Sequence, residues 1–210
     1  MNTPAGREIK RIELDLKQPV WRKFFMVSPL VVIGTREGDH YDLAPKHMVA
    51  ALGQENYFGF VCTPGHSTYQ NARREKAFSV SYIRPDQVVL ASLTATPRGK
   101  EASIEKGIVR ELATWKASSI DALMMCDAYA WLECALDRIV DDFGQYSLVA
   151  GKVIKAYVHQ DDLRLSERDE ARMIRENPLL AYIAYGRFAE ISETLGFPFP
   201  KGFDRRLIDQ

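Results

Sequence analysis

The chain has 210 residues, of which 28 are Lys or Arg and 28 are Asp or Glu, so its formal net charge is zero. Binding to nucleic-acid phosphates needs a concentrated surplus of basic residues, so the composition argues against a nucleic-acid-binding protein and leaves room only for a local basic patch. A chain of this length buries roughly 70% of its extended surface. We therefore expect one domain over residues 1–210, with a core that needs no disulfide or structural metal.

The three cysteines are odd in number and form no Cys-x-x-Cys pair. This usage is typical of a reducing compartment, so we expect a cytoplasmic protein. The first eleven residues lack the apolar core of a signal peptide. The longest apolar stretch, residues 24–33, is interrupted by a Ser-Pro pair and is too short to span a bilayer. The sequence thus predicts no membrane segment.

Six segments predict β-strands, because they are short, rich in β-branched or aromatic residues and bounded by turn residues. They are residues 28–35, 57–62, 78–82, 88–93, 128–136 and 148–159. Apolar side chains alternate with Ser79 and Ser81 in the third, the pattern of a strand with one buried face. Gly151 lies inside the last segment, where we expect a β-bulge or a sharp bend.

Three segments predict helices. Residues 67–76 are a polar stretch opened by hydroxyl side chains, and Ser166 and Asp169 form a capping pattern ahead of residues 170–176. Residues 179–195 predict a last helix, ended by a glycine and a proline. Many short strands with few helices favour a mainly β fold with peripheral helices (α+β), an antiparallel barrel rather than alternating βαβ units.

Familiar catalytic signatures are absent from the sequence. It contains no Gly-x-Gly-x-x-Gly, no P-loop, no Gly-x-Ser-x-Gly and no His-Glu-x-x-His, which argues against Rossmann and P-loop enzymes. The four histidines are scattered without a cysteine at ligand spacing, so no metal site is expected. The acid pairs at residues 141–142 and 161–162 are adjacent in sequence only, and we expect them to face water.

Two segments carry patterns that suit a ligand. In the first, an expected strand ends at Thr35, and the chain turns and continues through the small, flat run of residues 42–45, Asp-Leu-Ala-Pro. Such a run lets an extended backbone lie against a planar ligand and offer it main-chain donors and acceptors. An ordinary edge strand that contains a proline explains the same residues.

The second segment is residues 66–71, His-Ser-Thr-Tyr-Gln-Asn, which follows a Thr-Pro-Gly turn and begins an expected helix. Unpaired helix N–H groups, two hydroxyls and the helix dipole suit a phosphate monoester. Capping of the helix by Ser67 or Thr68 explains the same residues. Arg73 and Arg74 follow on the helix and are expected to be solvated.

The order and spacing of these segments resemble the flavin reductase-like family, the FMN-binding split barrels, from about residue 28 to residue 186. The matching stretches are residues 29–35, 42–45, 66–71, 78–81, 131–136 and 147–153. The resemblance implies a Greek-key antiparallel split barrel, a homodimer with FMN or FAD near the subunit interface, and electron transfer from NADH or NADPH to flavin.

The resemblance also implies a cofactor site. Its candidate residues are Thr35, Asp42, Leu43, Ala44, Pro45, His47, His66, Ser67, Thr68, Asn71 and Tyr146. Thr35 and residues 43–45 would line the isoalloxazine ring and ribityl chain, whereas Ser67, Thr68 and Asn71 would approach the phosphate. No catalytic side chain is expected, because the protein's part in hydride transfer is to place the nicotinamide against the flavin.

Three positions depart from the family pattern, which often has Asn at position 42, a hydroxyl residue near position 47 and His at position 146. A carboxylate at Asp42 would disfavour the anionic reduced flavin and lower its reduction potential, unless it is turned away or protonated. A position in solvent at the strand end is the alternative for Asp42. Tyr146 lacks the imidazole, but its ring can stack and its hydroxyl can donate.

The function expected is an oxidoreductase that passes reducing equivalents from NADH or NADPH to FMN. Two alternatives stay open: a flavin-binding electron carrier or store without nicotinamide chemistry, and a split barrel that has lost its flavin and acts through protein contacts. Tyr182, Tyr185 and Phe188 offer apolar surface to a second subunit, with a tail helix packed on its own barrel as the alternative. A monooxygenase partner has no support in the sequence.

Overall fold

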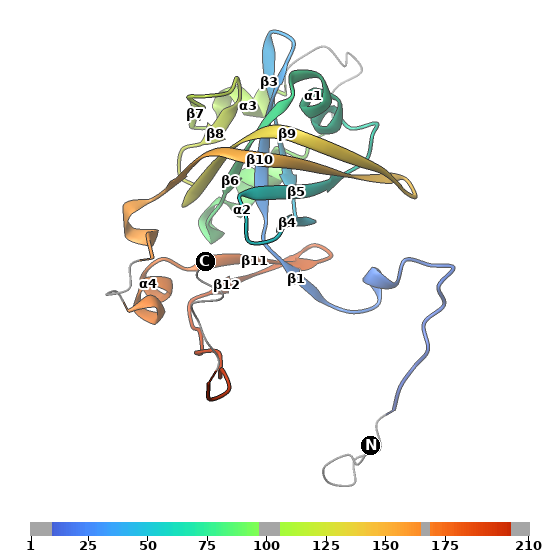
Figure 1. Ribbon diagram of the computed structural model, residues 1–210, viewed down its shortest axis with the longest axis vertical. Helices are drawn as coiled ribbons and strands as arrows, with labels where there is room; N and C mark the ends of the chain where they lie inside the picture. Colours follow the sequence, from blue (N-terminus) through green and yellow to red (C-terminus); the bar gives the residue numbers. More distant parts are fainter. Residues whose placement is uncertain (1–9, 97–105, 165–168, 203–210) are drawn as a thin grey trace.

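A computed structural model describes residues 10–96, 106–164 and 169–202. Its centre is an antiparallel seven-stranded sheet with the order β3-β2-β6-β9-β10-β5-β4, curled into a half-barrel (Figure 1). The strands of this sheet are β2 (Val31–Glu37), β3 (His40–Lys46), β4 (Val49–Ala51), β5 (Tyr57–Cys62), β6 (Ala77–Tyr82), β9 (Ala130–Phe143) and β10 (Tyr146–Val158). The mainly β fold with peripheral helices, a split barrel, is confirmed.

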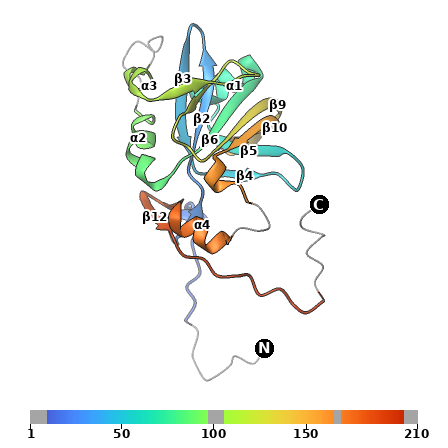
Figure 2. The same cartoon turned by 90° about the vertical axis from the view of Figure 1, so that its left-hand side faces the viewer.

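Two smaller sheets accompany the half-barrel within the described residues. They are formed by β7 (Thr114–Lys116) with β8 (Leu123–Met125), and by β1 (Met26–Ser28) with β11 (Leu179–Ala184) and β12 (Arg187–Ile191). The α-helices are α1 (Ser67–Glu75), α2 (Val88–Leu93), α3 (Gly107–Glu111) and α4 (Glu170–Glu176). Short 3-10 helices cover Val20–Arg22, Pro85–Gln87 and Gln160–Asp162. Figure 2 shows α2 and α3 beside one flank of the half-barrel and α4 below it.

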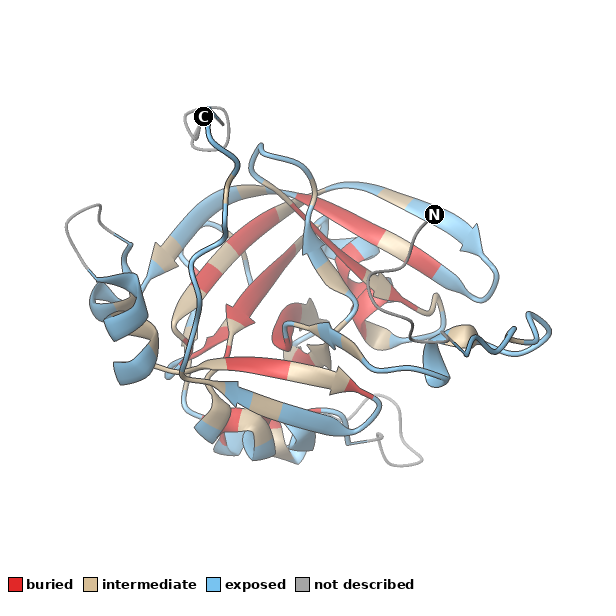
Figure 3. Ribbon diagram, turned by 90° about the horizontal axis from the view of Figure 1, so that it is seen from below, coloured by how far each residue is buried: buried red, intermediate tan, exposed pale blue. Residues whose placement is uncertain are grey.

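The core lies between the curled strands, and burial is greatest in the middle of the long strands and falls toward their tips (Figure 3). On β6, Phe78 and Val80 face the core, and Ser79 and Ser81 are buried as well. The expected strand with one face on the core is therefore confirmed, but its serine face is not exposed. The reason is β8, which covers the serine face: Ser79 donates a hydrogen bond to the Leu123 carbonyl (2.6 Å).

The expected irregularity at Gly151 is confirmed. The pairing of β9 with β10 shifts register between Ala150 and Gly151, as a bulge requires. A Cβ atom at Gly151 would lie 2.7 Å from the ring of Phe78. Glycine at this position therefore lets the bent strand approach the core closely.

Two expected elements are wrong. Residues 88–93 form α2 rather than a strand, because Pro85 opens a 3-10 turn that continues directly into the helix. Residues 179–191 form the β11–β12 hairpin rather than a helix. The hairpin forms because β1 supplies a pairing partner for β11 and because Gly186 turns with a positive φ of 81°.

The other two helices are confirmed. α1 occupies residues 67–75, and Asp169 caps α4 by accepting hydrogen bonds from the N–H groups of Ala171 (3.0 Å) and Arg172 (3.2 Å). Ser166, the other member of the capping pattern, lies outside the described residues. Within the part of the chain that is described, no helix has the length and apolar character needed to cross a membrane.

Candidate functional site

The run at residues 42–45 lies on β3, an edge strand of the half-barrel, as its proline indicated. β3 pairs with β2, which places Asp42 opposite Thr35 and Pro45 opposite Val32. Leu43 is fully buried, whereas Pro45 is half-buried at the end of the strand. The fold therefore fixes one side of this run in the core and leaves its other edge without a neighbouring strand among the described residues.

Asp42 is 1% exposed, so the alternative that it points into solvent is wrong. Its carboxylate pairs with the ammonium group of Lys106 (Oδ1 to Nζ, 2.9 Å) and accepts a hydrogen bond from the Thr68 hydroxyl (3.4 Å). The carboxylate is buried because α1 and Lys106 cover this face of β3. Asp42 is therefore buried and paired with a cation, which is a third arrangement besides a side chain that is turned away from the flavin or protonated.

Lys106 is a residue of the candidate site that the sequence analysis missed. Its ammonium group, in a side chain that is 11% exposed, also donates hydrogen bonds to the main-chain carbonyls of Leu43 (3.1 Å) and Thr94 (2.7 Å). Three oxygen acceptors thus surround one cation, the number that an ammonium group can serve. No local pattern marks this lysine, because its partners come from β3 and from the end of α2.

The first turn of α1 lies beside β3. The N-cap of α1 is His66, whose side chain makes no capping hydrogen bond, so neither Ser67 nor Thr68 is the cap. His66 is exposed, Ser67 is half-buried and Thr68 is 2% exposed. Burial, followed by the charges of Lys46 and Lys106, lowers the pKa of His66. The beginning of α1 therefore lies in a positively charged environment.

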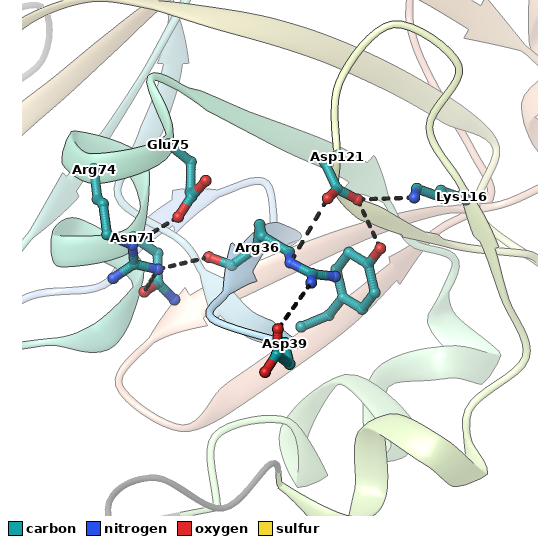
Figure 4. Close-up of polar contacts among 8 residues, drawn as sticks. Arg36, Asp39, Asn71, Arg74, Glu75, Lys116 and Asp121 are labelled. Atoms are coloured by element: carbon teal, nitrogen blue, oxygen red, sulfur yellow. Dashed lines mark hydrogen bonds and ion pairs between the residues drawn. The ribbon is translucent and has the colours of Figure 1, made fainter.

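Asn71 fastens α1 to β2. Its amide group donates a hydrogen bond to the Thr35 hydroxyl (3.1 Å), and its carbonyl oxygen accepts one from Arg74 (2.9 Å). Arg74 is exposed, as expected, but it also donates a hydrogen bond to the main-chain carbonyl of Arg36 (3.2 Å; Figure 4). The polar atoms of Asn71 and Thr35 thus bind each other, which fixes α1 at the start of the site.

A surface network, named here the outer cluster, consists of Arg36, Tyr41, Lys116 and Asp121. Figure 4 labels Arg36, Lys116 and Asp121 of this cluster. Asp121 accepts a hydrogen bond from the Tyr41 hydroxyl (2.6 Å) and pairs with Lys116 (3.0 Å) and Arg36 (3.6 Å). Hydrogen bonds from Tyr41 and Lys116 lower the pKa of Asp121. The outer cluster connects β2 and β3 to the β7–β8 sheet.

A cavity of about 430 Å³ opens between the end of β3, α2 and the β11–β12 hairpin. Its walls include Pro45 of β3, His47 just after β3, Val88 and Val89 of α2, and Tyr182 of β11. The imidazole of His47 stacks on Tyr182 at 4.6 Å between ring centroids. Its Nε2 atom is buried and has no hydrogen-bond partner in the described structure. Burial, followed by the charge of Lys46, lowers the pKa of His47, so the ring is neutral at pH 7.

Of the candidate residues, Tyr146 alone lies away from this region of the chain. It lies at the tip of the β9–β10 hairpin, 43% exposed, where its hydroxyl accepts a hydrogen bond from Gln145 (3.4 Å). The other candidates lie on β3, at Thr35 of β2, along α1 from its N-cap His66 to Asn71, and at the cavity. An apolar cavity with an unpartnered polar nitrogen, next to a positively charged helix start, fits a planar ring system that carries a phosphate.

The curled sheet with its edge strand and neighbouring helix start defines a split barrel, and solved structures share it. An FMN-binding protein from Thermus thermophilus has a TM-score of 0.72 at 19% identity, covering 90% of this chain and 99% of that one. Flavoredoxin from Methanosarcina acetivorans has a TM-score of 0.73 at 15% identity, covering 92% and 98%. The NADH:FAD oxidoreductase of Streptomyces globisporus has a TM-score of 0.67 at 14% identity, covering 87% and 98%.

Residues 22–187 match the model of the flavin reductase like domain, and the chain therefore belongs to the flavin reductase-like family. The resemblance seen in the sequence is confirmed. Among curated proteins, no sequence matches this chain. Membership in this family supports a flavin-related redox function.

Proposed function

We propose that the protein is an FMN-binding oxidoreductase that passes reducing equivalents from NADH or NADPH to flavin. The observation that carries this proposal is the cavity beside Pro45 and His47, because it combines apolar walls with an unpartnered buried nitrogen. Similar structures include an FMN-binding protein and an NADH:FAD oxidoreductase, so FAD is a second candidate cofactor. We also propose that residues 1–210 form one domain of a cytoplasmic protein.

The residues present would divide the binding of FMN between two ends. Main-chain groups of residues 43–45 and the His47 imidazole would hold the ring, and its flat face would pack against the apolar walls of the cavity. Ser67, the N–H groups of the first turn of α1 and the nearby charge of Lys46 would hold the phosphate. Thr68 and Asn71 would position this turn through their bonds to Asp42 and Thr35. Bound flavin would accept the hydride at its ring.

We further propose a homodimer. The N-terminal segment extends away from the half-barrel (Figure 1), and it exposes Phe24 (47%) and Phe25 (76%). Tyr185 (47%) and Phe188 (53%) are exposed on the β11–β12 hairpin. A second copy would cover these apolar side chains and bring a Tyr146 to the partner's site. Sedimentation at micromolar concentration should give a dimer, and a monomer with and without FMN would contradict it.

One anaerobic experiment tests the function. The purified protein is mixed with FMN, and its absorbance is followed during titration with NADH and then, separately, with NADPH. We expect binding of FMN and bleaching of the flavin band by at least one nicotinamide. Binding without bleaching would indicate a carrier or store, and absence of binding would indicate a barrel that has lost its flavin.

A Ser67→Ala variant tests the phosphate end. It should weaken FMN about tenfold, because a hydrogen bond to a charged group contributes about 1.5–3 kcal/mol, and it should leave riboflavin unaffected. Equal weakening of both ligands would show that the change disturbs α1 rather than a phosphate contact.

A further inference from the structure

The β9–β10 hairpin projects beyond the other strands of the half-barrel (Figure 1). Its tip, residues 143–146, exposes Phe143 (57%) and Tyr146 (43%). Among the described residues, β5 pairs with β10 only as far as Ser147, so the two strands of the tip pair with each other alone. The direction of Tyr146, which the proposed homodimer brings to the site of a second copy, therefore has to be fixed from within the hairpin or from its base.

A β-bulge bends the hairpin just before this tip. The pairing of β9 with β10 shifts register between Tyr146 and Leu148, where two residues of β9, Asp141 and Asp142, lie opposite the single residue Ser147. Asp142 has a positive φ of 72°, a conformation that a residue other than glycine keeps only where its surroundings hold the backbone. Since a bulge redirects the side chains beyond it, whatever holds this bulge also sets the direction of Tyr146.

One carboxylate oxygen closes the bulge and ties it to α1. Oδ1 of Asp141 accepts a hydrogen bond from the Ser147 hydroxyl (2.6 Å) and another from the Tyr69 hydroxyl (3.0 Å). Ser147 and Tyr69 are 0% and 2% exposed, so the core fixes both donors. The hydrogen bonds from Ser147 and Tyr69 and, less strongly, the charge of Arg73 lower the pKa of Asp141, so its carboxylate is ionised at pH 7.

This arrangement corrects the expectation that adjacent acids in the chain all face water. Asp142 and Asp161 are exposed, as expected. Asp162 is 10% exposed and pairs with Arg84, and Asp141 is exposed but holds two donors. Of these four acids, Asp141 is the one that is bound to α1.

We propose that Asp141 is a positioning residue, which fastens the β9–β10 tip to α1 through Tyr69 and so directs Tyr146 toward the site of the second copy. This inference rests on the proposed function and on the homodimer. Tyr69 follows Ser67 and Thr68 in α1, so the helix that would hold the phosphate of one site also fixes the ring offered to the other. There, Tyr146 would present an aromatic face to the stacked flavin and nicotinamide.

The test is a double-mutant cycle on kcat/KM for the nicotinamide, measured on the whole protein at saturating FMN. Tyr146→Ala should lower kcat/KM about tenfold, because the aromatic contact is lost. Tyr69→Phe removes only the hydroxyl bound to Asp141 and should lower kcat/KM about fivefold, because the ring is misplaced. The double variant should be no slower than Tyr146→Ala alone, since no ring is left to misplace.

Two further substitutions separate positioning from damage to the fold. Asp141→Asn keeps an oxygen that can accept both hydrogen bonds and should stay within about twofold of wild type, whereas Asp141→Ala should lose at least as much as Tyr69→Phe. The matched control is Tyr157→Phe, because the Tyr157 hydroxyl also donates to a carboxylate of β9, that of Glu133 (3.1 Å), away from the tip. It should leave kcat/KM unchanged.

The outcomes distinguish this inference from the proposed function. Wild-type protein that binds no flavin, or whose flavin no nicotinamide bleaches, would overturn both. An active protein that is a monomer, or that is unaffected by Tyr146→Ala, would overturn the inference alone. Additive losses in the double variant would place the effect of Tyr69 on α1 itself, and an Asp141→Asn variant as slow as Asp141→Ala would place it on charge; either result would also overturn it. If Tyr69→Phe does not fold, Asp141→Ala takes its place in the cycle.

Discussion

Two fully buried carboxylates of the half-barrel are stabilised in different ways. Asp42 lies on the edge strand β3 and pairs with a cation, Lys106. Glu133 lies on the central strand β9, is 0% exposed and accepts hydrogen bonds from the N–H groups of Ser118 (3.0 Å) and Ser119 (2.6 Å) and from the hydroxyl of Tyr157 (3.1 Å). The Ser118 hydroxyl is a fourth donor at 3.0 Å.

This difference separates a region in which the carboxylate has a structural role from a region in which the carboxylate affects the local electric field. Neutral donors hold the charge of Glu133 in place and fasten the segment before β8 to the centre of the sheet, far along the strand order from the edge. The Asp42–Lys106 pair consists of two charged groups, so a change in either partner alters the field at the edge where we propose that flavin binds. A buried carboxylate thus contributes to rigidity in one region and to electrostatics in the other.

Among the substitutions that test this comparison, Lys106→Met should have the largest effect on stability. The change removes a cation that pairs with the buried Asp42 carboxylate and donates hydrogen bonds to two main-chain carbonyls, so the free energy of unfolding should fall by about 3 kcal/mol. Urea unfolding of the flavin-free protein measures it. The double variant Asp42→Asn/Lys106→Met should recover most of the loss, and a double variant as unstable as the single one would show that the lysine acts through packing.

Glu133→Gln should have the next largest effect. The amide keeps the shape but loses charge-assisted hydrogen bonds from Ser118 and Ser119, so the free energy of unfolding should fall by about 2 kcal/mol. The potential of bound FMN should not change, which distinguishes this carboxylate from Asp42. A shift in the potential would break the distinction between the two regions.

The pH dependence of stability sharpens the comparison further. Burial alone would raise the pKa of Glu133, but the hydrogen bonds from Ser118, Ser119 and Tyr157 lower it overall. The stability from Glu133 is therefore present above its unfolded pKa of about 4.3 and is lost as pH falls through the lower folded pKa. The difference in unfolding free energy between wild type and Glu133→Gln should be full at pH 7 and shrink below about pH 4. A difference that stays constant down to pH 3 would contradict this linkage.

The smallest effect is expected at the outer cluster. The Asp121 side chain is 49% exposed, so its ion pairs with Arg36 and Lys116 are screened by water. Asp121→Asn should lower the free energy of unfolding by less than about 1 kcal/mol and leave FMN affinity unchanged. Urea unfolding and a flavin titration check both statements, and a loss comparable to that of Glu133→Gln would mean that exposure does not separate these carboxylates.

Much of the fold could be predicted from the sequence because its signals are local. Residues 57–62 are bounded by turn residues and form β5, and the bulge at Gly151 follows from a glycine inside a β-branched run. Residues 179–191 could not be assigned in this way, because their strand partner, β1, is distant in sequence. Apolar content alone does not distinguish a helix from a strand that finds a partner.

The candidate site could likewise be predicted only in part from the sequence. Residues 42–45 and 66–71 carry recognisable patterns, and the fold places both beside the same strand edge. Lys106 carries no pattern, because its role arises only when β3, α2 and its own segment meet in space. The sequence could therefore indicate the two segments of the candidate site, but not the lysine that pairs with Asp42.

Pro45 has a consequence for the association of the protein as well as for its ligand. An edge strand offers unpaired main-chain groups to any passing strand, and proteins that leave such an edge open risk aggregation. Pro45 has no N–H group, so a foreign strand cannot continue its ladder across this position of β3. The same ring that we propose lies beside the flavin therefore also discourages strand addition at this edge.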